Sequence, residues 1–174
     1  MKTFKIATYN VNSVRSRLPV VLPWLEKNRP AVLCLQETKV EDARFPAREF
    51  EEAGWNVVYR GGKGYNGVAI VSSGKADRVS LGLDDGGPAD EDRLIRAVFS
   101  GIAVVNTYVP QGVERESPRF AYKLEWFRRL RKFFARHFKP DQMILWCGDL
   151  NVAREAIDVH NPKRLLGHVD FTPE

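Results

Sequence analysis

Short runs of apolar residues, each ended by polar or glycine-rich residues, recur along this chain and predict β-strands. A continuous apolar run between turn residues is typical of a strand that is buried on both faces. The clearest runs cover 31–35 and 143–147, and Gly148 is expected to turn the chain sharply after the second. Weaker runs predict strands at 4–9, 55–59, 68–71 and 79–83, and the two residues between 94–99 and 102–106 predict a hairpin.

Three segments have the spacing of apolar residues that is typical of helices. In the first, around 18–25, Pro19 suits a first helical turn, whereas Pro23 is expected to kink or shorten the helix. Residues 45–53 predict a short helix and 118–138 the longest one. The long helix has one predicted apolar stripe, made of Phe120, Leu124, Phe127, Leu130, Phe134 and Phe138. Its basic residues are interpreted as a solvated face, with DNA contact as the alternative: Arg128, Arg129, Arg131, Lys132 and Arg136.

Hairpins and helices without strict strand–helix alternation predict a layered α+β fold. The chain of 174 residues has the length of one domain, and its net charge of +5 favours a polyanionic partner. Cys34 and Cys147 lie in apolar runs and are interpreted as small buried hydrophobes, which predicts a reducing, cytoplasmic location. We expect no signal peptide, and no apolar run approaches the length of ~20 residues that a membrane span needs.

Polar residues stand at the ends of four predicted strands. Asn10 and Asn12 follow the first strand, Glu37 the second, Tyr108 the later hairpin strand, and Asp149 with Asn151 the last. Each alone has an ordinary explanation, because Asn and Asp form turns and a glutamate is usually exposed. Polar groups gathered at one end of a shared sheet would instead form a single cleft, and we expect that arrangement here.

The residue types in this set suit hydrolysis of a phosphate ester. A hard cation such as Mg²⁺ prefers carboxylate oxygens, water and phosphate, and Glu37 is the best candidate ligand. The three histidines lack the spacing of a zinc site. Asp149 can orient or deprotonate a water, Asn151 can hold that water or a phosphate oxygen, and Tyr108 can donate to the phosphate. Direct attack by water is expected, because no serine or cysteine lies in a convincing triad.

Five short motifs follow one another along the chain, and together they are far more specific than any one alone. They are Tyr9-Asn10-Val11-Asn12-Ser13-Val14-Arg15, Leu35-Gln36-Glu37-Thr38-Lys39, Gly64-Tyr65-Asn66-Gly67-Val68-Ala69, Tyr108-Val109-Pro110-Gln111-Gly112 and Gly148-Asp149-Leu150-Asn151-Val152. In order and spacing they resemble the signatures of the exonuclease III family of apurinic/apyrimidinic endonucleases. The resemblance covers nearly the whole chain.

That resemblance implies a four-layered αββα sandwich of the DNase I-like type. It implies cleavage of double-stranded DNA beside abasic sites and 3′–5′ exonuclease or 3′-phosphodiesterase activity with Mg²⁺ or Mn²⁺. Glu37 is then the metal ligand, supported by Asn10, with Tyr108, Asp149 and Asn151 at the reacting phosphate. The residues implied to grip DNA are Arg15, Lys63, Tyr65, Gln111 and Asn12. Glycines 62, 64 and 67 are expected to let backbone amides approach phosphates closely.

The sequence departs from the family by matching only its N-terminal two-thirds. The family's terminal Ser-Asp-His motif has no counterpart, since the chain contains no Asp-His dipeptide. We therefore expect an incomplete sandwich within a single truncated domain, and an isolated chain that is inactive or nearly so. The inner face of the first sheet is expected to be exposed, and to be covered by the missing portion or by a second copy.

Two alternatives to a DNA repair nuclease stay open at this stage. One is a phosphoesterase of the same superfamily that acts on a different phosphate ester, such as a lipid or inositol phosphate. The other is a catalytically silent DNA-binding or assembly module. The basic charge and the Tyr-Val-Pro-Gln-Gly motif favour DNA over the first, and the retained carboxylates favour an enzyme over the second.

Overall fold

The computed structural model describes residues 4–62, 64–89 and 91–173. They form two compact units. The first unit comprises residues 1–108 and 140–149, and the second comprises 109–139 and 150–174.

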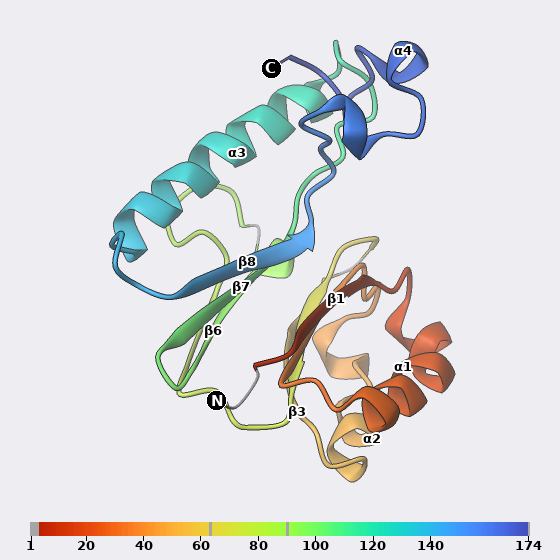
Figure 1. Ribbon diagram of the computed structural model, residues 1–174, viewed down its shortest axis with the longest axis vertical. Helices are drawn as coiled ribbons and strands as arrows, with labels where there is room; N and C mark the ends of the chain where they lie inside the picture. Colours follow the sequence, from red (N-terminus) through yellow and green to blue (C-terminus); the bar gives the residue numbers. More distant parts are fainter. Residues whose placement is uncertain (1–3, 63, 90, 174) are drawn as a thin grey trace. The chain divides into compact units, whose positions relative to one another are not determined.

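Two four-stranded sheets make up the framework of the first unit (Figure 1). One has the order β1-β2-β4-β3 and the other the order β5-β6-β7-β8. The pairs β1–β2 and β7–β8 are parallel, and all other neighbours are antiparallel. The strands are β1 (Ile6–Asn10), β2 (Val32–Gln36), β3 (Asn56–Arg60), β4 (Val68–Ser72), β5 (Arg78–Leu81), β6 (Leu94–Phe99), β7 (Ile102–Tyr108) and β8 (Ile144–Asp149).

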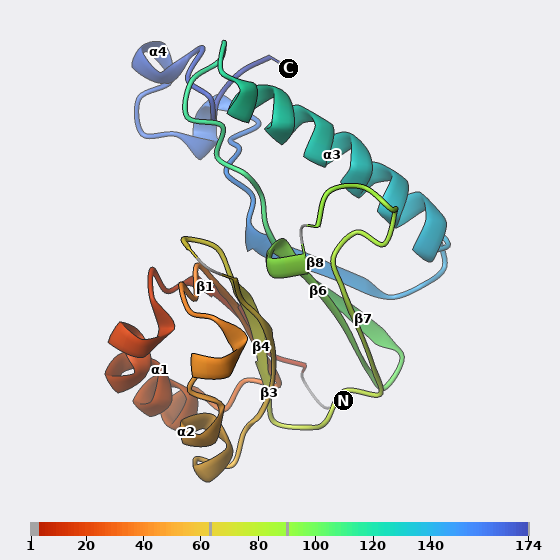
Figure 2. The same cartoon turned by 180° about the vertical axis from the view of Figure 1, so that it is seen from behind.

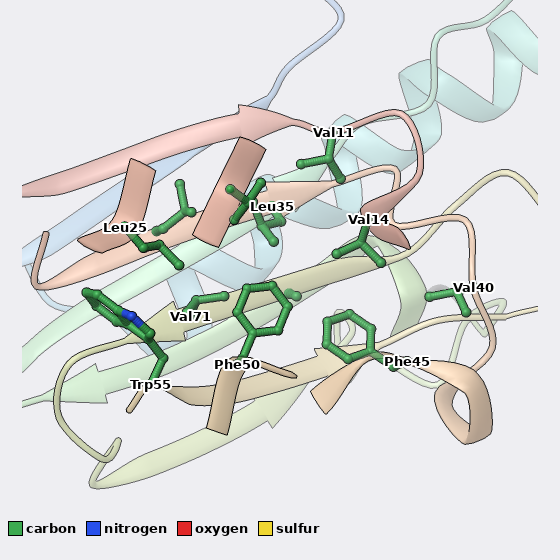
Figure 3. Close-up of a cluster of buried hydrophobic side chains, with 12 residues drawn as sticks. Val11, Val14, Leu25, Leu35, Val40, Phe45, Phe50, Trp55 and Val71 are labelled. Carbon is green, nitrogen blue, oxygen red and sulfur yellow. The ribbon is translucent and has the colours of Figure 1, made fainter. Parts of the chain in front are cut away.

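Helices cover the outer face of the first sheet, where α1 (Val14–Asn28) and α2 (Ala47–Glu52) pack on its strands (Figure 2). The core between them is built from buried aliphatic and aromatic side chains, among them Leu25, Phe50 and Trp55 (Figure 3). Two short 3₁₀ turns, η1 (Asp42–Arg44) and η2 (Glu91–Arg93), complete this unit.

The inner face of the first sheet is not exposed, so that prediction is wrong. Val32, Cys34 and Ile70 of this face pack with Ile95 and Val104 of the second sheet in one buried cluster. Two sheets that bury their apolar faces against each other make a sandwich core, which needs no further partner on those faces. Helix, sheet and sheet give three of the four predicted layers within this unit.

The predicted strands and the hairpin 94–106 are confirmed, but the last strand differs from its prediction. Strand β8 is an edge strand, with the side chains of Leu145 and Trp146 exposed to 36% and 43%. An apolar run does not distinguish a strand buried on both faces from an edge strand that carries large side chains. The fully buried strands are β2 and β4, at the centre of the first sheet.

Pro23 does not shorten its helix, which was one of the two effects predicted for it. Helix α1 runs from Val14 to Asn28 with Pro19 and Pro23 both inside it. Both prolines lie on the exposed side of the helix. Water can therefore solvate the backbone carbonyl that a proline leaves without a hydrogen-bond donor.

The second unit contains the long helix α3 (Pro118–His137), the 3₁₀ turn η3 (Ala156–Asp158) and the short helix α4 (Pro162–Leu165). Ser117 caps α3, because its hydroxyl accepts a hydrogen bond from the backbone N–H of Phe120 at 3.2 Å. The buried side of α3 differs from the predicted stripe: it is made of Phe120, Lys123, Trp126, Arg129, Leu130 and Phe133. Arg129, expected on the solvated face, is thus buried.

Among the described helices, none combines the length and the apolar character that crossing a membrane requires. The mixed strands and helices confirm the α+β class.

Candidate active site

The predicted site residues of the first unit come from two sheets, not from one shared sheet. Asn10 ends β1 and Glu37 follows β2, and these strands are parallel neighbours in the first sheet. Tyr108 ends β7 and lies opposite Asp149 at the end of β8, in the second sheet. Because both pairs are parallel, each sheet delivers two polar side chains at one end.

Asn10 joins the two sheets at this point. Its Nδ2 donates to Oε1 of Glu37 at 2.8 Å and to Oδ2 of Asp149 at 2.8 Å. Its Oδ1 accepts the backbone N–H of Asn12 at 3.1 Å, which fixes the orientation of the amide. One neutral side chain therefore brings two carboxylates from different sheets to the same place.

Glu37 is held in an unusual backbone conformation. Its φ angle is 51°, in the left-handed region that a glutamate rarely adopts, and such residues cluster at functional sites. Lys39 Nζ lies 2.9 Å from Oε2 of Glu37 and also donates to Oδ1 of Asn12 at 2.5 Å. Partial burial opposes ionisation of Glu37, but the hydrogen bonds from Asn10 and Lys39 outweigh it and lower its pKa. The site therefore contains an ionised carboxylate.

Tyr108 is close enough to Glu37 to feel its negative charge, and its ring packs against Arg93. Burial, followed by the negative charge of Glu37, raises the pKa of Tyr108 to about 12. The Arg93 guanidinium lies 4.9 Å from the centre of the phenol ring, and its Nη1 donates to the Tyr108 carbonyl at 3.1 Å. At neutral pH the phenol thus keeps its proton and can donate it in a hydrogen bond.

A buried amide pair fastens the two sheets behind these residues. Gln36, next to Glu37, donates through Nε2 to Oδ1 of Asn106 on β7 at 2.7 Å. Asn106 in turn donates to the carbonyls of Leu35 at 3.0 Å and Ala69 at 2.9 Å. Both amide side chains are almost fully buried, and a buried polar group that is fully hydrogen-bonded specifies one alignment. The pair therefore fixes β7 against β2 and β4.

Gly148 was predicted to turn the chain sharply, and that prediction is wrong. The residue lies within β8. A Cβ atom on this residue would come within 2.0 Å of the Thr107 carbonyl oxygen, and its φ angle is 136°. Only glycine fits a position with both constraints. Its role is to let β8 approach β7 closely, one residue before Asp149.

The glycine-rich loop is built around Asn66. Asn66 donates to Asp92 at 3.0 Å and accepts a hydrogen bond from Arg93 at 2.9 Å. Gly67 approaches Thr38 so closely that a Cβ there would lie 2.0 Å from the threonine hydroxyl oxygen. This packing explains why a glycine is needed at position 67, independently of the predicted approach to phosphate.

The predicted DNA contacts in the first unit are on its surface. Tyr65 is 80% exposed, and Lys39 lies 5.5 Å from the centre of its ring. Arg15 in α1 and Asn12 are also exposed. Lys63 lies outside the described residues.

Two predicted residues belong to the second unit. Gln111 is exposed, and Asn151 donates through Nδ2 to the carbonyl of Val109 at 2.9 Å. Asn151 also has a left-handed backbone conformation, with a φ angle of 47°.

The oxygen atoms of Glu37 and Asp149 fit a hard divalent cation. Both carboxylates are held by the same amide group, and Glu37 is ionised. Within the part of the chain that the structure describes, no group of three or more His, Cys, Asp or Glu side chains makes a complete protein cage. Magnesium sites commonly use one or two carboxylates together with water and substrate phosphate, and this set agrees with that pattern.

Sequence reasoning missed three residues around this site: Lys39, Arg93 and Asn106. Lys39 lies two residues after Glu37 in the motif Leu35-Gln36-Glu37-Thr38-Lys39, so the sequence did hold a signal for this contact. Arg93 and Asn106 offer no such signal, because their contacts join segments that are distant along the chain.

Comparison with known proteins places this geometry in a family. The model of the endonuclease/exonuclease/phosphatase family matches residues 7–173, nearly the whole chain. The chain belongs to that family. It is a family of divalent-metal-dependent nucleases, which agrees with a site of oxygen ligands.

Relatives within the family include DNA repair nucleases. A DNA-(apurinic or apyrimidinic site) endonuclease of Dictyostelium discoideum is 30% identical over 98% of this chain and 48% of its own length. Exodeoxyribonuclease III of Haemophilus influenzae is 30% identical over 98% of this chain and 68% of its own. The chain thus spans about half to two thirds of the length of these relatives.

A solved AP endonuclease from Archaeoglobus fulgidus has a similar fold. It is 53% identical, with a TM-score of 0.94, over 97% of this chain and 65% of that one. This likeness confirms the DNase I-like α+β fold and the predicted resemblance to the exonuclease III family.

Proposed function

We propose that the protein carrying this chain hydrolyses the DNA backbone at abasic sites and removes nucleotides or blocking groups from 3′ ends, with Mg²⁺ or Mn²⁺ as the cation. The observation that carries the proposal is the bridge from Asn10 to Glu37 and Asp149, with Tyr108 beside it. The names of the relatives supply the substrate class.

Each residue of the site has a role in this proposal. Glu37 holds the cation, and Asn10 fixes the Glu37 carboxylate. The bound cation would polarise the phosphate and neutralise its charge. Tyr108 has a pKa of about 12, so its phenol is protonated at neutral pH and donates a hydrogen bond to a phosphate oxygen. Asp149 takes the proton of the attacking water, and Asn151 orients that water or the phosphate.

The proposed DNA contacts are the residues that the family resemblance implies: Arg15, Asn12, Lys63, Tyr65 and Gln111. Of these, Arg15, Asn12, Tyr65 and Gln111 are exposed. A basic or polar side chain contributes to binding of the phosphate backbone, and an exposed aromatic ring can stack on a base.

Cleavage of a duplex with one abasic site tests the proposal. A protein of the length of the relatives should nick this duplex when Mg²⁺ is present, and EDTA should abolish the cleavage. An intact duplex without abasic sites is the matched substrate. Hydrolysis of an inositol or lipid phosphate without cleavage of DNA would refute the proposal in favour of another phosphoesterase.

The 174-residue chain on its own should cleave the same duplex more slowly by about 10²–10³-fold. The resemblance implies that the histidine of the family's terminal Ser-Asp-His motif lies at the scissile phosphate, and this sequence has no counterpart of that motif. Equal rates for the 174-residue chain and the longer protein would contradict this expectation.

A further inference from the structure

Lys123 is a buried lysine in the second unit. It lies in α3, and only 2% of its side chain is exposed. An ammonium group out of water is costly unless hydrogen bonds and an opposite charge surround it. Its contacts therefore indicate what the buried charge holds in place.

The ammonium group of Lys123 is surrounded by four oxygens. Nζ lies 3.1 Å from the carbonyl of Gln111, 2.5 Å from that of Asn151 and 2.6 Å from that of Val169. The fourth contact is an ion pair of 3.0 Å with Oδ1 of Asp170. Three backbone segments that are distant in sequence thus meet at one charge.

Two of these segments carry proposed site residues. The β7 loop (residues 109–117) contains Gln111, and the β8 loop (residues 150–154) contains Asn151. The loops also touch directly, through the hydrogen bond from Asn151 to Val109. Gly112 of the β7 loop lies against the stem of Lys123, where an added Cβ would be 3.3 Å from Cδ.

We propose that Lys123 is a positioning residue that clamps the β7 and β8 loops together, so that Gln111 and Asn151 are held ready for the DNA substrate. The proposal rests on the proposed function for its consequence in catalysis, but the clamp itself is a property of the loops. Carbonyl oxygens can be held in this way only by a donor with several hydrogens, and a buried ammonium group meets that need.

The test compares three variants of a protein of the length of the relatives. Lys123→Met keeps an unbranched apolar stem, shorter by one heavy atom, and removes the ammonium group. Lys123→Arg keeps the charge and several donors. Lys132→Met is the matched control, because Lys132 is an exposed lysine of the same helix. Each variant is assayed well below its melting temperature, so that loss of folded protein does not count as loss of activity.

The first readout is hydrogen–deuterium exchange of the backbone. In Lys123→Met, exchange should rise in the β7 loop and the β8 loop together, and Lys132→Met should match the wild type. Unchanged exchange in either loop overturns the clamp. Increased exchange in both loops while the wild type fails to cleave abasic DNA would leave the clamp standing and refute the proposed function.

The second readout is steady-state cleavage of the abasic duplex. Lys123→Met should lose about tenfold or more in kcat/KM, with a rise in KM because Gln111 is a proposed DNA contact. Lys123→Arg should recover part of this loss. A variant that melts at a lower temperature but retains wild-type kcat and KM would show a purely structural lysine and overturn the proposal.

Discussion

The two units bury polar side chains in different ways. In the first unit, the neutral amides of Asn106 and Gln36 align two sheets whose strands already pair their own backbone groups. In the second unit, one charge on Lys123 holds backbone carbonyls from segments outside any sheet. Strands supply their own backbone partners, so a few amides suffice, whereas loops leave carbonyls that need an added donor. Regular structure and irregular structure thus need different means to hold site residues.

The largest expected effect comes from the carboxylates that the first unit brings together. Glu37→Gln and Asp149→Asn should each lower kcat for the abasic duplex by about 10³-fold or more, because in the proposed mechanism Glu37 binds the cation and Asp149 activates the water. Single-turnover cleavage of a labelled oligonucleotide measures this loss. Glu26→Gln, at an exposed position in α1, is the control and should retain full activity.

The second largest effect is expected for Gly148→Ala, which tests the close approach of the strands that carry Tyr108 and Asp149. The new Cβ would overlap the Thr107 carbonyl oxygen, and the φ angle of 136° is itself strained for alanine. A loss of about 3 kcal/mol in the free energy of unfolding is expected, measured by chemical denaturation. Gly74→Ala meets no atom within 4 Å and should change stability little. Equal stability of the two variants would contradict the role given to Gly148.

Asn106→Ala tests the amide pair of the first unit directly. It leaves Gln36 without one acceptor and opens a small cavity between the sheets, so we expect a loss of about 2 kcal/mol in the free energy of unfolding. Urea denaturation of this variant and of Asn56→Ala, which changes an exposed strand residue, measures the difference. If the two lose the same amount, the buried amide is not what aligns the sheets.

For the first unit, the sequence predicted where the strands lie along the chain better than which strands pair with each other. Apolar runs located the strands, and polar residues at their ends located Asn10, Glu37, Tyr108 and Asp149. The runs do not encode which strand lies beside which, so one shared sheet was expected where two sheets supply the site.

The second unit was harder to predict because its buried side is partly charged. A pattern of apolar residues cannot find Lys123 or Arg129, since both residue types usually face water. The buried stripe of α3 therefore lies about one position away from the predicted stripe.

In the first unit, the close contacts of Gly148 could not be predicted, because a glycine after an apolar run predicts a turn as readily as a close approach.

The smallest expected effects concern the exposed residues, and they test whether both units contact DNA. Tyr65→Ala in the first unit and Gln111→Ala in the second should each raise KM for the abasic duplex by about three- to tenfold, because each removes one surface contact. Neither should change the melting temperature, since both side chains are exposed. Tyr65→Phe is the control that keeps the ring and should retain most of the binding. If only Tyr65→Ala weakens binding, DNA is held by the first unit alone, and the Lys123 clamp then acts through Asn151 instead of Gln111.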